Sequence, residues 1–228
     1  MIRKSQMILS IAVFSLFSLV GVAQDELPGT KYRVTITNVT KAQIFSPPVA
    51  TVHYRDIQLF QLGQPASGTL AEMAEEGNAA PLAEEWAAHD SVYDVQVSEG
   101  PVMPGASITL EVTAAGRFNY ISVAGMLVTT NDAFFAATLR RPNDQFLKTG
   151  FSSVVYSDAH AYDAGTEFNS ESCDYIPGPP CGNGGAHDPT EAEGYVYVHN
   201  GVHGIGDIAV ENYDWRGPVA RITVERVD

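Results

Sequence analysis

Several segments of the chain alternate apolar and polar residues with a period of two. In the first of them, Tyr32, Val34 and Ile36 are separated by single polar residues. Successive side chains of a strand point to opposite faces, so this alternation predicts half-buried β-strands. The segments that share the pattern are 32–37, 107–112, 195–199 and 220–225.

Other segments extend the β-rich pattern. The run 120–128 is almost entirely apolar, which indicates a central strand covered on both faces. Segments 54–60 and 92–97 are further strand candidates. No repeat of fixed period occurs, and the Gly/Pro-rich stretch 176–189 is followed by too few strand residues for a second core. The chain is therefore predicted to form one all-β domain, a β-sandwich with a long loop.

One region departs from the alternation and predicts helix. Thr69 and Glu72 have the spacing of a capping box, and Gly77 is placed to end that helix. A second short helix is expected over 81–87, with Trp86 packing inward. We therefore expect one or two short helices inserted between strands.

The first residues have the pattern of a secretory signal. Arg3 and Lys4 precede an apolar run over 7–20, and small residues lead up to a cleavage site after Ala23. A transmembrane anchor is the alternative, but the run is shorter than the ~20 apolar residues of a bilayer span. The expected product is one domain over 24–228, secreted, periplasmic or at the cell surface, with no membrane span after cleavage.

The charge balance excludes some partners. The chain has a formal charge of −14, and without Arg3 and Lys4 it has 11 basic and 27 acidic residues, or −16. Such a surface repels phosphate backbones and anionic membranes, so no nucleic-acid partner is expected. A hydrophobic content of 45% is ample for a packed core.

Cys173 and Cys181 are the two cysteines of the chain. In an exported protein a disulfide is the default expectation. Half of a zinc site is the alternative, although the spacing is longer than that of zinc knuckles. We predict the disulfide.

Catalytic motifs are missing from the sequence. It has no G-x-S-x-G, P-loop or H-E-x-x-H motif. His199 and His203 have the i, i+4 spacing of a helical zinc pair, but the glycines around them indicate a turn, so we expect them to bind nothing. His160 and His187 are isolated and receive no role. We therefore predict no catalytic residues.

The acidic residues are more informative. Asp163 and Glu167 stand at the two ends of a short turn, and Asp132 follows the apolar run 120–128. Calcium takes six to eight oxygen ligands, which such loops can supply from carboxylates, carbonyls and water. From these residues alone, both a calcium site and ordinary solvated loop acids remain open.

Six segments in order resemble the spondin N-terminal domain family of F-spondin and mindin. The resemblance covers approximately residues 31–227. It is carried by the strand 32–37, the Phe-Ser-Pro-Pro segment 45–48 with the later His53-Tyr54, the helix segment 66–77, and the segments 130–135, 162–167 and 218–224.

The resemblance implies a C2-like antiparallel β-sandwich that holds Ca²⁺ through Asp132, Asp163 and Glu167. Glu167 departs from the family, which has Asp there, and Ala133 replaces the aromatic residue that follows the first ligand. The longer side chain of Glu167 affects the position and affinity of the ion, and Ala133 loosens the rim of the site.

The resulting expectation is a secreted, non-catalytic module for adhesion or for attachment to an extracellular protein or glycan. Fold analogy alone does not establish function. The alternatives are a metal-assisted hydrolase and a carbohydrate-binding module, the latter requiring an exposed row of aromatics such as Trp215, Tyr195 and Tyr197. Asn38 begins a glycosylation sequon, which we predict to be structural.

Overall fold

The computed structural model describes residues 27–142 and 154–227, so the predicted signal segment lies outside the described residues. Strands dominate the part of the chain that is described, as expected for an all-β domain. The strands are β1 (Thr30–Asn38), β2 (Val49–His53), β3 (Val92–Val97), β4 (Ser107–Ala114), β5 (Tyr120–Met126), β6 (Ala133–Arg140), β7 (Val154–Asp163), β8 (Tyr197–Val198) and β9 (Ala220–Arg226). The helices are α1 (Gly68–Glu76), α2 (Ala80–Ala87) and α4 (Val210–Tyr213).

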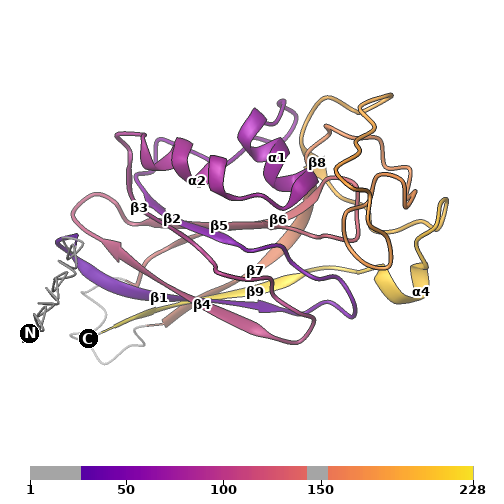
Figure 1. Cartoon of the computed structure of the whole chain (residues 1–228). Coiled ribbons are helices and arrows are strands. Elements are labelled where there is room, and N and C mark those ends of the chain that lie inside the picture. The colour runs from indigo at the N-terminus through magenta and orange to yellow at the C-terminus, as the bar shows by residue number, and fades with distance from the viewer. Residues whose placement is uncertain (1–26, 143–153, 228) are drawn as a thin grey trace, which may run out of the picture.

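The strands form one antiparallel path that folds over into two layers. Its order is β3-β2-β5-β6-β7-β9-β1-β4, with β8 added beside β7. The fold-over occurs in β7, whose residues 154–159 pair with β9 and whose residues 160–163 pair with β6. Figure 1 shows the β2-β5-β6 layer above the β1-β4-β9 layer, with the long loops of the C-terminal third at one end. The predicted sandwich is confirmed.

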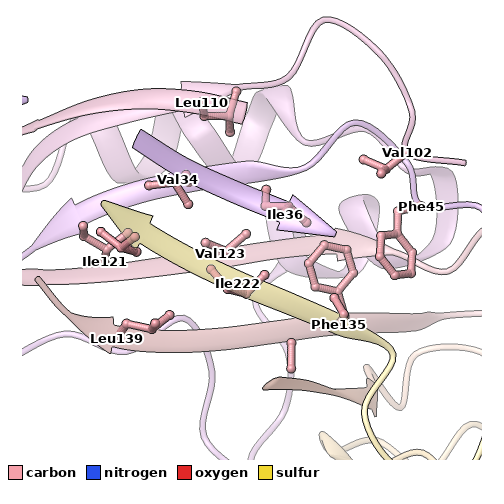
Figure 2. Close-up of a cluster of buried hydrophobic side chains, with 14 of the residues drawn as sticks. Val34, Ile36, Phe45, Val102, Leu110, Ile121, Val123, Phe135, Leu139 and Ile222 are labelled. Carbon is pink, nitrogen blue, oxygen red and sulfur yellow. The ribbon is translucent and has the colours of Figure 1, made fainter. Parts of the chain in front are cut away.

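The space between the two layers is filled by apolar side chains from both. Figure 2 shows Val34 and Ile222 from one layer close to Val123 and Phe135 from the other. The rings of Phe135 and Phe45 have centroids 4.4 Å apart, and both residues are fully buried. Truncating a buried phenylalanine of this kind costs about 3–5 kcal/mol, so each of these rings contributes substantially to the stability of the domain.

Helices α1 and α2 lie between β2 and β3 in sequence, as predicted, and cover the outer face of the β2-β5-β6 layer (Figure 1). The N-terminal cap of α1 differs from the prediction. Ser67, not Thr69, is the capping residue, and its hydroxyl accepts from the backbone N–H of Leu70 at 3.2 Å. Gly77 ends the helix at φ 70°, a conformation that favours glycine.

Two strand predictions are corrected by the structure. Residues 54–60 form a loop, and the strand is the preceding β2, whose five residues are all buried. The apolar residues of that loop pack on the outer face of the sheet, which explains their spacing without a strand. The predicted strand 195–199 is reduced to the two residues of β8, while β6 and β7 were not predicted. None of the described helices is both long and apolar enough to cross a bilayer.

Candidate metal centre

Asp132 and Asp163 are brought together by the pairing of β6 with β7. Ala133, the first residue of β6, is in register with Asp163, the last residue of β7. The backbone N–H of Ala164 donates to the carbonyl of Asp132 at 3.2 Å. Both carboxylates are fully buried. Two acidic residues thus meet where two adjacent strands end.

The turn after β7 is built around the carboxylate of Asp132. Its Oδ2 accepts from the backbone N–H groups of Thr166 at 2.8 Å and Glu167 at 3.1 Å. Asp163 Oδ1 accepts from the backbone N–H of Gly165 at 2.8 Å. Gly165 has φ 67°, and a Cβ there would lie 2.2 Å from the carbonyl oxygen of Tyr195, so only glycine fits.

Two oxygens of the predicted ligands have no hydrogen-bond partner among the described residues. They are Asp132 Oδ1 and Glu167 Oε2, both buried. Burial, followed by the charge of Asp163, raises the pKa of Asp132 well above its ordinary range. Burial likewise raises the pKa of Glu167 to about 7. A cation beside Asp132 Oδ1 would satisfy that oxygen and relieve the repulsion between Asp132 and Asp163.

The side chain of Glu167 has partners of its own, which include a histidine that received no role from the sequence. Glu167 Oε1 accepts from the backbone N–H of Asp188 at 3.0 Å and lies 2.8 Å from Nδ1 of His187. His187 Nε2 lies 2.6 Å from Glu76 Oε1 at the end of α1. Burial lowers the pKa of His187, but the hydrogen bonds to Glu76 and Glu167 outweigh it and leave the pKa raised. His187 therefore connects the acidic turn to the helix.

The other oxygen of Asp163 faces β8 and the residues after it. Asp163 Oδ2 accepts from the side-chain amide of Asn169 at 2.5 Å, and that amide also donates to the hydroxyl of Tyr197 at 2.9 Å. His199 Nε2 lies 3.7 Å from the same oxygen. Burial lowers the pKa of His199 to about 4, so this pair is a neutral imidazole beside a carboxylate, not an ion pair. His199 and His203 were not expected to bind a metal together, and the backbone N–H of His203 donates to Glu171.

The predicted ligands Asp132, Asp163 and Glu167 are of the chemical type that binds calcium, but their side chains do not form one metal-binding cluster. All three are carboxylates, the hard oxygen ligands that Ca²⁺ prefers. Within residues 27–142 and 154–227, no group of three or more His, Cys, Asp or Glu side chains is arranged to hold a metal ion. Asp132 and Asp163 form the centre of the site, and Glu167 joins it through its backbone while its carboxylate contacts His187.

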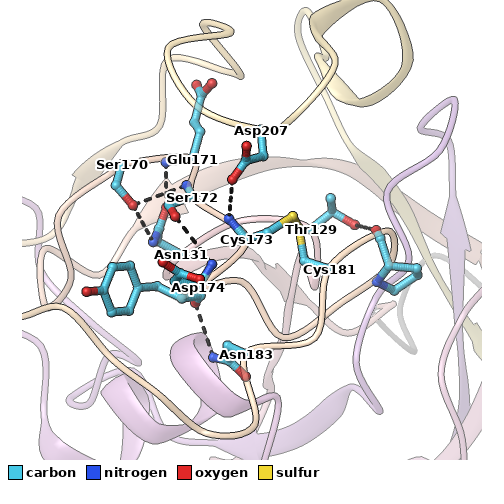
Figure 3. Close-up of a disulfide and its surroundings, with 12 residues drawn as sticks. Thr129, Asn131, Ser170, Glu171, Ser172, Cys173, Asp174, Cys181, Asn183 and Asp207 are labelled. Atoms are coloured by element: carbon cyan, nitrogen blue, oxygen red, sulfur yellow. Dashed lines mark hydrogen bonds between the residues drawn. A yellow bond between two sulfur atoms is a disulfide. The ribbon is translucent and has the colours of Figure 1, made fainter.

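Beside the turn 163–167, which we call the acidic turn, two loops are held together by Glu171, a residue that the sequence did not single out. The carboxylate of Glu171 accepts from the backbone N–H groups of His203, Gly204 and Ile205, at 2.5, 2.7 and 2.9 Å. Its own N–H donates to the side chain of Asn131 at 3.2 Å (Figure 3). The only sequence signal was the glycine-rich stretch around 204, which exposes backbone N–H groups. Glu171 joins the loop before β6 to the loop after β8.

The predicted disulfide between Cys173 and Cys181 is confirmed (Figure 3). Both cysteines pack against a small buried cluster that includes Ile176, Val202 and Ile208. The bridge therefore closes a loop with its own core directly beside Glu171.

The aromatic residues considered for sugar binding do not form a row. The rings of Tyr195 and Tyr197 are 5.9 Å apart and tilted by 56°. Trp215 instead contacts the ring of His199 at 5.0 Å. The sequon residue Asn38 is fully buried, and its amide donates to the carbonyls of two other residues. A structural role for Asn38 agrees with the prediction.

Comparison with known families gives one match. The sequence model described as Spondin_N matches residues 36–181, which is more than half of the chain and includes the whole acidic turn. None of the curated proteins matches the chain significantly.

Proposed function

Because the chain belongs to the spondin N-terminal domain family, an extracellular domain type, we propose that it is an exported, non-catalytic module that binds one Ca²⁺ ion and attaches to a ligand outside the cell. The disulfide and the family both suit an oxidising extracellular environment. The partner we propose is an extracellular protein or glycan.

One observation supports the calcium proposal above the others. Asp132 and Asp163 are both fully buried side by side, and Asp132 Oδ1 has no partner. Burying like charges together is costly unless a cation or a proton compensates them. Burial is the largest effect on the pKa of both residues, and it raises both. A divalent cation is the compensation that also uses the free oxygen.

Asp132, Asp163 and Glu167 would hold the ion, with backbone carbonyls and water completing its shell. Calcium would supply positive charge and no redox chemistry. The residues of the chain do the positioning, since the N–H groups of Thr166 and Glu167 fix the orientation of Asp132. Binding would then draw the Glu167 carboxylate away from His187.

The role that follows is structural order at one end of the sandwich. The site joins the loop before β6 to the turn after β7, and the disulfide loop lies beside them (Figure 1). Loops at the end of a rigid sandwich are where binding surfaces are commonly found. Calcium would hold this surface in one conformation and thereby favour attachment to the partner.

Thermal and urea unfolding with calcium, with magnesium and with a chelator tests the proposal. At 100 times its dissociation constant, calcium should add about 2.7 kcal/mol to the free energy of unfolding. Magnesium should substitute poorly because it keeps its waters and requires a tighter octahedral shell. Asp163→Asn should sharply reduce the calcium effect, whereas Asp90→Asn, on the exposed residue after α2, should leave it unchanged. Identical unfolding midpoints in all three solutions would refute the calcium site.

A further inference from the structure

A groove lies on the outer face of the β2-β5-β6 layer, on the part that the helices leave open. Its floor includes Tyr120 and Thr138, and Arg55 and residues 57–60 of the loop after β2 form one wall. Its volume is about 390 Å³. Small-molecule sites commonly occupy about 300–1,000 Å³, so the groove is large enough for a ligand. Thr138 follows Asp132 by six residues, which places this part of the groove roughly 20 Å from the candidate metal centre. The opposite end of the groove is lined by Tyr162, which precedes Asp163 in the sequence.

Aromatic rings line the apolar side of this groove. The ring centroids of Phe60 and Tyr162 are 4.6 Å apart, and those of Phe60 and the buried Phe134 are 5.2 Å apart. Phe60 and Tyr162 are both half-buried, so each keeps part of its surface open to the groove. The electron-rich faces of such rings attract polarised C–H groups, as on the face of a pyranose ring.

The polar side of the groove contains the hydroxyl of Thr138, whose hydrogen already forms a hydrogen bond within the protein. His53 Nδ1 lies 2.8 Å from the carbonyl oxygen of Tyr54, which can only accept, so Nδ1 carries the proton. Burial lowers the pKa of His53, so the ring is neutral and Nε2 accepts from Ser122 Oγ at 2.8 Å. Ser122 must then accept from Thr138 Oγ1, at 2.7 Å. Thr138, which is exposed, therefore offers the groove only an acceptor, which suits a ligand that carries hydrogen-bond donors such as hydroxyls.

Arginines gather at this end of an otherwise acidic protein. Arg55 lines the groove, and Arg140 follows Thr138 on the same face of β6, in register with Tyr120. Neither arginine forms an ion pair with any described carboxylate. The adjacent acid, Asp56, is engaged by the hydroxyl of Ser91 at 2.9 Å. The guanidinium of Arg55 lies over the ring of Tyr54, 5.7 Å from its centroid, and has no carboxylate partner among the described residues. A guanidinium in this state is suited to a carboxylate, which it can bind with two parallel hydrogen bonds.

We propose that this groove binds an acidic saccharide. The face of one sugar ring packs on Phe60 and Tyr162, a sugar hydroxyl donates to Thr138, and the sugar carboxylate is bound by Arg55. The arginines favour a uronic acid over a neutral sugar, and the acceptor-only hydroxyl favours a sugar over a plain aromatic acid. This inference goes beyond the proposed calcium function and uses none of its residues.

Titration calorimetry of the exported chain with a galacturonic acid trimer tests the proposal, with the methyl ester of the same trimer as the neutral comparison. The buffer contains a chelator, because uronates themselves bind calcium, and circular dichroism checks that the domain is folded. The free acid should bind at least about tenfold more tightly than the ester. Arg55→Gln should weaken binding about tenfold or more, and Thr138→Val about threefold or more. Arg33→Gln, on an exposed arginine of β1 that pairs with Glu225, should change nothing.

Several outcomes would overturn the proposal. They are the absence of binding, equal binding of acid and ester, an equal effect of Arg33→Gln and Arg55→Gln, and equally tight binding of a short poly-glutamate peptide. The last would indicate a general anion surface. If the domain binds the sugar but calcium does not change its unfolding, the groove proposal stands and the calcium site is refuted. The failure of one proposal is therefore distinguishable from the failure of the other.

Discussion

Asp132 Oδ2 lies 3.1 Å from the backbone nitrogen of Glu167, so one predicted ligand fixes the backbone of another. The same oxygen accepts from Thr166 at 2.8 Å. The turn is thus organised by a fully buried carboxylate whose other oxygen has no partner. Without a cation, this arrangement places Asp132 beside Asp163 with only hydrogen bonds to offset their charges.

Asp132→Asn should therefore have opposite effects with and without calcium. In chelator, the variant should be more stable than the wild type by on the order of 1 kcal/mol, because it removes a buried charge while its amide oxygen still accepts from Thr166 and Glu167. In calcium, the wild type should become the more stable protein. Urea unfolding of both proteins in both buffers measures this. A variant that gains as much from calcium as the wild type would show that Asp132 is not a ligand.

Removing the disulfide should destabilise the loop end of the domain. The bridge joins residues eight positions apart, and closing so small a ring contributes about 2.5 kcal/mol in the chain-entropy model. The double variant Cys173→Ala, Cys181→Ala should lose about this much free energy of unfolding. Chemical denaturation measures the loss, and a wild type whose two thiols react with an alkylating probe before reduction would contradict the bridge itself.

Glu171→Ala should release the loop at 203–205. Three backbone N–H groups would lose a charged acceptor, at a cost of about 2–3 kcal/mol in total. Hydrogen exchange of the amides of His203, Gly204 and Ile205 should accelerate together. Glu191→Ala is the matched control, because Glu191 has φ 62° against 54° for Glu171 but is exposed. Equal exchange in both variants would mean that backbone conformation, not the carboxylate, holds the loop.

His53 should make stability fall as the solution becomes acidic. Burial lowers its pKa below the ordinary 6.5, so between the folded pKa and 6.5 the unfolded chain binds more protons than the folded one. Stability therefore rises with pH across this window and is lost as the pH falls below about 6.5, by at most about 1.4 kcal/mol per pH unit.

The slope of the unfolding free energy against pH, compared between wild type and His53→Gln, isolates this contribution. His199 has a lowered pKa too, but it contributes equally to both proteins. Parallel slopes between pH 5 and 7 would show that the pKa of His53 is the same in the folded and unfolded states, so that burial does not lower it.

The sequence by itself determined the local structure where burial follows a regular spacing. The alternation over 32–37 indicates that one face of β1 is buried. The apolar run at 120–126 indicates that β5 is covered on both faces. The pair of cysteines and the acids at 132, 163 and 167 were also visible, because their chemistry is carried by residue type. The loop 54–60 was misread as a strand because apolar residues that pack over a sheet can imitate the spacing of a strand within it.

Only the tertiary structure decided which distant residues meet. His187 contacts Glu76 across 111 positions of the chain, and Glu171 reaches three N–H groups more than 30 positions away. The fold-over within β7 brings Asp163 beside Asp132, and the open face beyond the helices creates the groove at Thr138. Periodicity records which face of a segment is buried. It does not record the strand order and loop paths, which set the partner on that face.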